Sequence, residues 1–322
     1  MNIPLLLQLR DAGGQFLGID YLGMDRDRLG VEVAELEAFG VALEWHPYLG
    51  IAYRGHAERL CPDLIEWSLG TQHVGRRVAV WNRVASTNDL AARAAGSLAN
   101  DGLVILAEEQ TAGRGRRGRA WSAPAQSSVL MSVLLFPPAW LADPGWLTAL
   151  GAVATAEVVE AWTGQPARIK WPNDVRVEGR KVAGILVERG LGAVLGIGLN
   201  VNITAADLPA DLQESATSLQ VLRVEPLDRS EVVRSLIRRI DAHYLNGLNG
   251  DDALLNACWR DRLELRGLRV QVQTTSEIIH GCLFDANLRH GLTLKTDQGD
   301  ARQVPGAEVV SMARAEDAPI SI

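Results

Sequence analysis

The sequence predicts a chain of mixed class, α+β/α/β, that folds as three parts. Three observations along its 322 residues support this prediction. Two helical patterns and a short strand pair open the chain, alternating strands and helices fill its middle, and short alternating runs with Gly and Pro between them close it. We therefore expect parts at residues 1–66, 67–265 and 266–322.

The first part has the pattern of a winged helix-turn-helix. After an opening helix, residues 25–39 form a second helix, because Leu29, Val33 and Leu36 recur at helical spacing and Gly40 follows as a helix-ending residue. Strands at 41–45 and 51–53 flank a turn with Pro and Gly. Two helices followed by a two-stranded wing are typical of that fold.

The middle part alternates strands with helices, and the last part contains only strands. Strands are predicted at 77–84, 103–107, 129–136, 168–171, 175–177, 182–189 and 193–202, and helices at 88–95, 147–162, 230–245 and 251–263. Beyond residue 268, runs at 269–273, 278–284, 291–296 and 307–312 predict a small SH3-like β barrel.

Composition narrows the class of protein. With 47% apolar and 22% charged residues the chain can bury a large core, and it has no apolar run of the roughly 18–20 residues that cross a membrane. Its first residues lack the basic region and cleavage site of an export signal, and its three cysteines lack CxxC spacing. We therefore expect a cytoplasmic protein without membrane contact, disulfide framework or zinc site.

The charge is concentrated at the start of the chain. Overall, 32 Lys and Arg stand against 39 Asp and Glu, which gives −7, and the first 66 residues hold five Arg against eleven acidic residues. The middle part is balanced, with 21 residues of each sign. The acidity therefore belongs to the predicted winged helix-turn-helix.

An arginine loop lies between two predicted strands of the middle part. Residues 113–119, GRGRRGR, combine four guanidinium groups with three glycines that let a backbone approach a ligand closely. Small-anion binding is one interpretation. An RGG-like nucleic-acid tract and a solvated loop are the alternatives, although the tract is single and is flanked by strands.

A second motif contains two of the only three lysines. The segment KWPND at 170–174 is followed by Lys181 in GRKVAGIL at 179–186. Asn173 could bind adenine, and Asp174 could hold Mg²⁺ or accept a proton. Taken alone, however, these five residues favour a plain β-turn. A returning strand that presents Lys181 beside the arginine loop would make a strongly positive pocket.

Two further motifs are weaker alone. Ser86-Thr87-Asn88 precedes a helix, where Ser or Thr serves as an ordinary N-cap, and GIGLNVN at 196–202 could form a pocket floor or a strand end. The sequence contains no HExxH, P-loop or GxSxG motif. It also has no GxGxxG dinucleotide fingerprint, because GRGRRG at 113–118 has the glycine spacing but lies in a loop between two predicted strands. The commonest hydrolase, NTPase and dehydrogenase classes are thereby excluded.

Taken in order, these motifs closely resemble those of biotin protein ligases, and the flanking parts resemble the bifunctional class that also represses biotin operons. The motifs are STN at 86–88, EQTAGRGRRGRAW at 109–121, KWPND, GRKVAGIL and GIGLNVN. The resemblance implies an adenylate-forming ligase of EC class 6 that uses ATP and Mg²⁺ to convert biotin to biotinyl-5'-AMP. The biotinyl group then passes to a lysine of the biotin carboxyl carrier domain of acetyl-CoA carboxylase or a similar carboxylase.

The resemblance also implies roles for individual residues. It assigns the biotin ring system to Ser86, Thr87, Asn88 and Gln110, and the loop that closes over biotin and the adenylate to Arg114, Gly115 and Arg116. Lys181 is assigned to the biotin carboxylate and the α-phosphate, and Asn173 to adenine.

Electrostatics explains why such residues are needed. A carboxylate must attack a phosphate, so catalytic cations at Arg116 and Lys181, with Mg²⁺, would cover the developing charge. Asp174 is our hypothesis for the group that helps to deprotonate the acceptor lysine, or else for the Mg²⁺ ligand.

The first part departs from the DNA-binding relatives. Its helix at 25–39 carries five acidic residues against Arg26 and Arg28, so we predict weak or absent operator binding. A lipoate-protein ligase is the alternative enzyme, and a nucleic-acid-binding regulator is the alternative from another class. The resemblance leaves a homodimer open.

Overall fold

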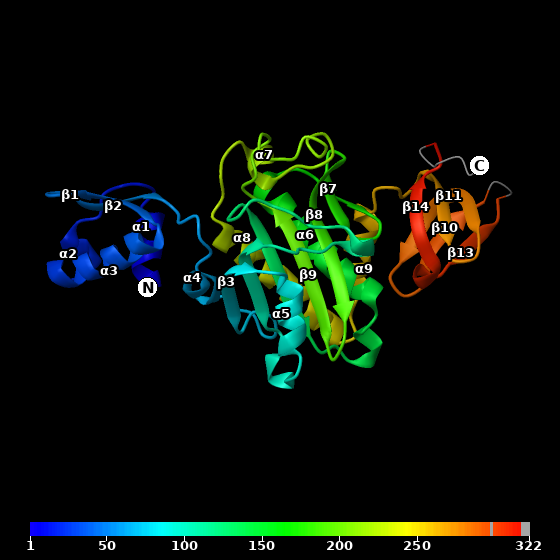
Figure 1. The fold of residues 1–322 in the computed structure, drawn as a ribbon, viewed down its shortest axis with the longest axis horizontal. Helices are drawn as coiled ribbons and strands as arrows, with labels where there is room; N and C mark the ends of the chain where they lie inside the picture. Colours follow the sequence, from blue (N-terminus) through cyan, green and yellow to red (C-terminus); the bar gives the residue numbers. More distant parts are fainter. Residues whose placement is uncertain (297–298, 317–322) are drawn as a thin grey trace.

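A computed structural model describes residues 1–296 and 299–316 of the chain. Figure 1 shows three bodies in a row, with the N-terminal helices at one end, a large sheet with its helices in the middle, and a small group of strands at the other end. The predicted third part extends to residue 322, so 297–298 and 317–322 of it lie outside the described residues.

The N-terminal body contains three helices and one antiparallel strand pair. They are α1 (Ile3–Asp11), α2 (Ile19–Leu22), α3 (Arg26–Phe39), β1 (Ala42–His46) and β2 (Gly50–Gly55). Asp25 caps α3 by accepting a 2.8 Å hydrogen bond from the Arg28 N–H, and Gly40 ends it in the left-handed region at φ 111°. The predicted helix and strand pair are confirmed, whereas α2 has only four residues and gave no periodic signal.

The middle body is built on a seven-stranded sheet in the order β3-β4-β5-β9-β8-β7-β6. Only the β3–β4 pair is parallel among these neighbours. The strands are β3 (Val78–Val84), β4 (Val104–Gln110), β5 (Ser128–Leu135), β6 (Arg168–Lys170), β7 (Asp174–Val177), β8 (Arg180–Arg189) and β9 (Ala193–Asn200). Each predicted strand of the middle part is thus present, with ends that differ by at most three residues.

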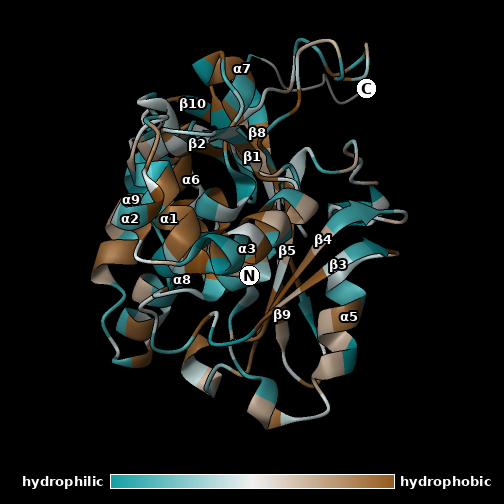
Figure 2. Cartoon of the chain, turned by 90° about the vertical axis from the view of Figure 1, so that its left-hand side faces the viewer, coloured by the Kyte–Doolittle hydropathy of each residue, from teal (hydrophilic) through white to brown (hydrophobic). Residues whose placement is uncertain are grey.

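Helices cover both faces of this sheet. In Figure 2, α5 (Thr87–Ala94) lies on one side of β3, β4, β5 and β9, and α6 (Pro144–Thr163) and α8 (Arg229–Leu248) lie on the other. Every residue of β5 is buried as a result, which explains its nearly continuous apolar sequence. Asp143 caps α6 through the Trp146 N–H at 2.8 Å, and Gly164 ends it.

Shorter elements complete the middle body and the connections. The α-helices are α4 (Pro62–Glu66), α7 (Leu219–Arg223) and α9 (Ala253–Arg262), and the 3-10 turns are η1 (Leu98–Asn100), η2 (Arg116–Gly118), η3 (Ala139–Leu141) and η4 (Gly306–Glu308). Among the described helices none is long and apolar enough to cross a membrane.

The C-terminal body is a five-stranded antiparallel sheet in the order β13-β12-β11-β10-β14. Its strands are β10 (Arg269–Thr274), β11 (Ile278–Asn287), β12 (Gly291–Lys295), β13 (Ala301–Val304) and β14 (Val309–Arg314). Strand β13 was not predicted, because three of its four residues are exposed and it shows no apolar alternation.

The start of α8 fastens the N-terminal body to the middle one. Arg10 of α1 pairs with Glu231 at 2.8 Å. The buried Arg229 pairs with the buried Glu108 of β4 at 2.6 Å, and Glu108 also accepts the Leu60 N–H at 2.6 Å. A buried pair of this kind, in which both carboxylate oxygens accept hydrogen bonds, holds its partners in one arrangement.

Candidate active site

All ten residues singled out by the sequence line one cavity of about 340 Å³. They come from the start of α5, the end of β4, the arginine loop, the β6–β7 connection and β8: Ser86, Thr87, Asn88, Gln110, Arg114, Gly115, Arg116, Asn173, Asp174 and Lys181. Segments up to 95 residues apart in the chain therefore meet, and Arg116 and Lys181 share one cavity.

The start of α5 forms one end of the cavity. The Thr87 N–H donates to Gln110 Oε1 at 2.7 Å, and the Thr87 hydroxyl lies 3.0 Å from the same oxygen. Ser86 occupies the N-cap position and is 3% exposed, but its side chain makes no capping hydrogen bond. The routine capping role considered from the sequence therefore does not apply, and the Ser86 hydroxyl is available to the cavity.

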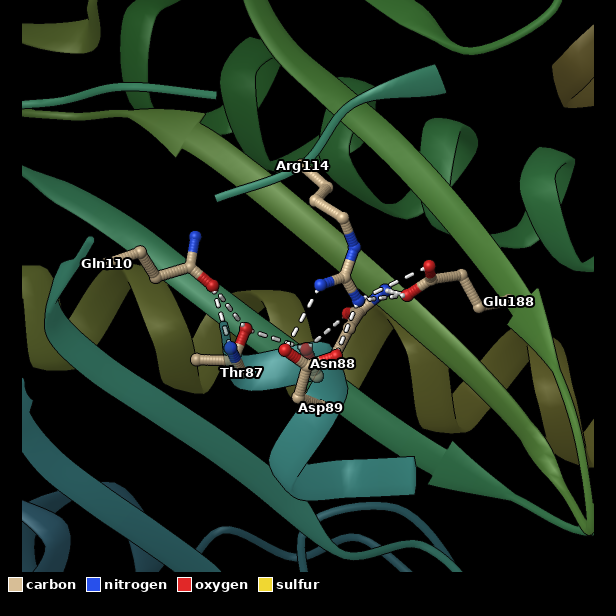
Figure 3. Close-up of polar contacts among 7 residues, drawn as sticks. Thr87, Asn88, Asp89, Gln110, Arg114 and Glu188 are labelled. Atoms are coloured by element: carbon tan, nitrogen blue, oxygen red, sulfur yellow. Dashed lines mark hydrogen bonds and ion pairs between the residues drawn. The ribbon is translucent and has the colours of Figure 1, made fainter. Parts of the chain in front are cut away.

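Asn88 is held by residues that the sequence analysis missed. Its Nδ2 donates to Glu188 Oε2 at 2.6 Å, as Figure 3 shows, and Ser132 Oγ lies 2.6 Å from its Oδ1. A Cβ at Gly196 would lie 2.4 Å from the same Oδ1, so only glycine leaves room for the Asn88 amide. Ser132 and Glu188 sit inside apolar strand patterns and carried no motif of their own.

Arg114 binds protein carboxylates in this structure. Its guanidinium contacts Asp89 at 2.7 and 3.1 Å and Glu188 at 3.2 Å, as Figure 3 shows. The hydrogen bond from Arg114 lowers the pKa of the Asp89 carboxyl, and the bonds to Asp89 and Glu188 raise the pKa of Arg114. Of the predicted loop cations, Arg114 is thus neutralised by its neighbours.

The arginine loop closes on itself and reaches the C-terminal body. The Gly115 N–H donates to the Arg119 carbonyl at 2.7 Å, and the Trp121 N–H donates to the Gly113 carbonyl at 2.9 Å. At the tip, Arg117 adopts φ 58° and its guanidinium donates to the Val310 carbonyl of β14. Residues 310–312 line the cavity as well, a contribution outside the motifs that we recognised.

Lys181 forms the opposite end with Asp174. Lys181 Nζ lies 2.7 Å from Asp174 Oδ1 and 5.4 Å from the centre of the Trp121 ring. The β7–β8 register shifts between Val175 and Arg176, and this bulge places Lys181 beside Gly184 on the cavity side of β8. In a regular strand Lys181 and Gly184, three residues apart, would point to opposite faces of the sheet.

The cavity end near Lys181 carries surplus positive charge. Arg116, Arg119 and Lys170 also line it and form no ion pair with any residue in the described ranges. Desolvation by the surrounding protein, with Arg117 nearby, lowers the pKa of the Arg116 guanidinium, and Asp174 opposes this shift. An arginine nevertheless stays charged at neutral pH.

Asn173 is fixed to the neighbouring strand. Its Nδ2 donates to the Ile185 carbonyl at 2.9 Å, and the Ile185 N–H donates back to the Asn173 carbonyl at 2.9 Å. One donor of its amide is therefore occupied in this structure. Asp174 pairs with Lys170 as the first residue of β7, so it begins a strand, and the predicted turn ends before it.

The cavity floor is made of glycines under a tryptophan. A Cβ at Gly198 would lie 2.4 Å from Trp121 Cε2, and one at Gly184 would lie 3.0 Å from Trp121 Cζ3. Trp121 Nε1 is buried and has no hydrogen-bond partner among the described residues. Gly196 and Gly198 of GIGLNVN therefore form part of the cavity lining. Its asparagines do not, because Asn200 and Asn202 donate to the backbone carbonyls of Thr217 and Leu227.

The two ends of the cavity differ in chemistry. Neutral hydroxyl and amide groups gather at the start of α5, and cations that form no ion pair in the described part of the chain gather near Lys181. A ligand with an uncharged polar head and an anionic tail matches this arrangement, because each end supplies the groups that it needs.

Comparison with known proteins agrees with this chemistry. The biotin/lipoate A/B protein ligase family matches residues 80–202 of the chain. The biotin–[acetyl-CoA-carboxylase] ligase of Mycobacterium tuberculosis is 38% identical over 231 residues, which cover 67% of this chain and 84% of that protein. The bifunctional ligase/repressor BirA of Bacillus subtilis is 29% identical over 298 residues, 89% of this chain and 92% of that protein.

Among solved structures, the biotin protein ligase from Aquifex aeolicus in complex with biotin and ATP superposes with a TM-score of 0.64 at 26% identity. The match covers 74% of this chain and all of that one. The fold and the cavity thus define a ligase of the biotin/lipoate class. More narrowly, the chain belongs to the biotin protein ligase family.

Proposed function

We propose that this protein is an ATP-dependent biotin protein ligase. It activates biotin as biotinyl-5'-AMP and transfers the biotinyl group to a lysine of a carrier protein. The observation that supports this most strongly is the shared cavity. Arg116 and Lys181 line one end of it, and Ser86, Thr87 and Gln110 line the other. The two ends match the acid group and the ureido ring of biotin.

The proposed residue roles follow the chemistry of each end. Ser86, Thr87, Asn88 and Gln110 bind the ring system, and Gly115 and Arg116 bring the arginine loop over the ligand. Lys181 and Arg116 balance the charge that develops when the biotin carboxylate attacks the α-phosphate, and a preorganised cation of this kind lowers the barrier by roughly 3 kcal/mol. Asn173 lies on the same wall and is assigned to the adenine ring.

Asp174 is the proposed ligand for Mg²⁺. It is the single carboxylate that lines the cavity within the described residues, and those residues contain no cluster of three metal-ligating side chains. This fits Mg²⁺, which proteins commonly hold with one or two carboxylates while nucleotide phosphates and water complete the shell. The ion would supply positive charge at the phosphate oxygens.

Asp174 also has a second proposed role, as the group that helps to deprotonate the acceptor lysine. Its contact with Lys181 at 2.7 Å holds the carboxylate at the charged end of the cavity. The acceptor that we propose is the biotin carboxyl carrier domain of acetyl-CoA carboxylase or a related carboxylase. Its lysine would enter beside the arginine loop, where the C-terminal strand β14 also borders the cavity.

The flanking bodies have a proposed identity as well. We assign a winged helix-turn-helix to residues 1–66 and an SH3-like barrel to residues 266–322, with the catalytic part between them. In the first body, α3 exposes Asp27, Glu35 and Glu37, so we propose that DNA binding is weak or lost. The three free cysteines fit a reducing compartment such as the cytoplasm, and a homodimer is an assembly that we propose to test by sedimentation.

The direct test uses a purified carrier domain. Incubation with ATP, Mg²⁺ and biotin should yield a carrier that streptavidin detects, and excess lipoate should not compete. Labelling by lipoate in place of biotin would reassign the enzyme to the lipoate-protein ligases.

A further inference from the structure

We propose that Glu188 is a positioning residue for the ring end of the biotin site. This inference rests on the proposed function. Glu188 lies on β8 and does not line the cavity, yet its carboxylate contacts two residues that do, Asn88 and Arg114. Figure 3 shows the three side chains turned toward one another.

The contacts join three separate segments of the chain. Glu188 Oε2 accepts from Asn88 Nδ2 at 2.6 Å, and the two carboxylate oxygens lie 3.4 and 3.2 Å from the Arg114 guanidinium. Asn88 belongs to α5 and Arg114 begins the arginine loop. One carboxylate therefore fixes the helix and the loop against the sheet.

Glu188 determines which way the Asn88 amide points. An ionised carboxylate only accepts hydrogen bonds, so the NH₂ group of Asn88 must face it. The amide oxygen is then directed to Ser132, 2.6 Å away, and the floor at Gly196 leaves space for this orientation. Without Glu188 the amide could turn over, which would exchange the donor and the acceptor that it offers to a ligand.

Glu188 also sets the charge at this end. Asp89 and Glu188 together carry two negative charges against the single positive charge of Arg114. Six residues of β8 lie between Glu188 and Lys181, so roughly 20 Å of strand separates the two. A biotin carboxylate is thus directed toward Lys181 and away from Glu188, and the uncharged ring remains beside Asn88.

The test compares Glu188→Ala and Glu188→Gln with the wild type. A matched control is Glu109→Gln, because the Glu109 side chain is 36% exposed and pairs with Arg83 at 3.2 Å, whereas that of Glu188 is 39% exposed and pairs with Arg114 at 3.2 Å. Initial rates of biotinyl-5'-AMP formation give KM for biotin, KM for ATP and kcat. Calorimetry gives Kd for biotin and for uncharged biotinamide.

Glu188→Ala should raise KM for biotin about 10- to 100-fold, the usual worth of hydrogen bonds to a charged group, and leave kcat and KM for ATP within about threefold. Glu188→Gln keeps an acceptor for Asn88 and should fall between the alanine variant and the wild type. Because Glu188 acts on the ring end, Kd for biotinamide should rise by the same factor as Kd for biotin. Glu109→Gln should match the wild type.

The outcomes separate the inference from the proposed function. A wild type that forms no biotinyl-5'-AMP would remove the proposed function itself. An active wild type with an unchanged KM for biotin in the Glu188 variants, or with a loss confined to kcat, would overturn the positioning role. If Glu188→Ala does not fold, Glu188→Gln decides by the same criteria.

Discussion

Gly196→Ala tests the packing of the ring end most sharply. The added Cβ would lie 2.4 Å from Asn88 Oδ1, about 1 Å closer than ordinary van der Waals contact allows. Asn88 cannot move by this distance without breaking a contact, because its Oδ1 lies 2.6 Å from Ser132 and its Nδ2 lies 2.6 Å from Glu188. A displacement of 1 Å would lengthen at least one of them beyond hydrogen-bonding distance.

The expected cost has two components. Overpacking in a buried site costs about 1–3 kcal/mol, so Tm should fall by roughly 2–4 °C for each kcal/mol. Displacing Asn88 should in addition weaken biotin binding by about tenfold, the worth of one lost hydrogen bond. Calorimetric titration with biotin and thermal unfolding followed by circular dichroism measure the two quantities separately.

Gly190→Ala is the control for this substitution. Gly190 lies in the β8–β9 turn, a Cβ there would have nothing within 4 Å, and its backbone is not in the left-handed region. It should bind biotin as the wild type does. Full stability and unchanged biotin affinity in Gly196→Ala would refute the reasoning that Asn88 is held rigidly.

Four further predictions concern the charged groups. Lys181→Met should slow biotinyl-5'-AMP formation by about 100-fold or more, measured by pyrophosphate release, and a rate near that of the wild type would exclude its charge from the reaction. Asp174→Asn should impair either adenylate formation or transfer to the carrier in single-turnover assays, and normal rates in both would remove both of its proposed roles. Because Arg114 lowers the pKa of Asp89, this pair should stabilise the fold above about pH 4 and lose its effect as the pH falls through the lowered pKa. Asp89→Asn should therefore reduce the fall of Tm at acidic pH. A variant whose Tm falls at acidic pH as that of the wild type does would contradict the pairing. In gel shifts with biotin, ATP and its own upstream DNA, the protein should bind weakly, and a specific low-nanomolar complex would show that the acidic first body does not prevent operator binding.

Residue spacing predicted most of the fold, because its elements are long or strongly patterned. The helix around Val33 repeats apolar residues at helical spacing, and β5 is apolar throughout because it is buried on both faces. The helix α2 and the strand β13 escaped prediction, since four residues with no apolar repeat leave no pattern to read.

The site was predictable where a motif carried it. Arg116 and Lys181 stood out because arginines cluster around the first and lysine is rare elsewhere in the sequence. Ser132 and Glu188 did not, since isolated polar residues within an apolar strand or near its end are ordinary. The bulge that turns Lys181 into the cavity depends on the pairing of β7 with β8, which no local pattern shows.

The contact from the arginine loop to β14 was beyond sequence reasoning for the same reason. Arg117 and Val310 lie 193 residues apart, and neither neighbourhood contains a signal for the other. Long-range contacts of this kind follow from the packing of whole bodies, and only the folded structure reveals them.

The central claim is that one cavity holds biotin at one end and joins its acid group to the nucleotide at the other. Mass spectrometry of the enzyme after incubation with biotin, ATP and Mg²⁺, without carrier, measures this directly. The account predicts a bound species with the mass of biotinyl-5'-AMP that disappears in Lys181→Met. Unreacted biotin and ATP with the wild type, or the same adenylate yield with the variant, would contradict it.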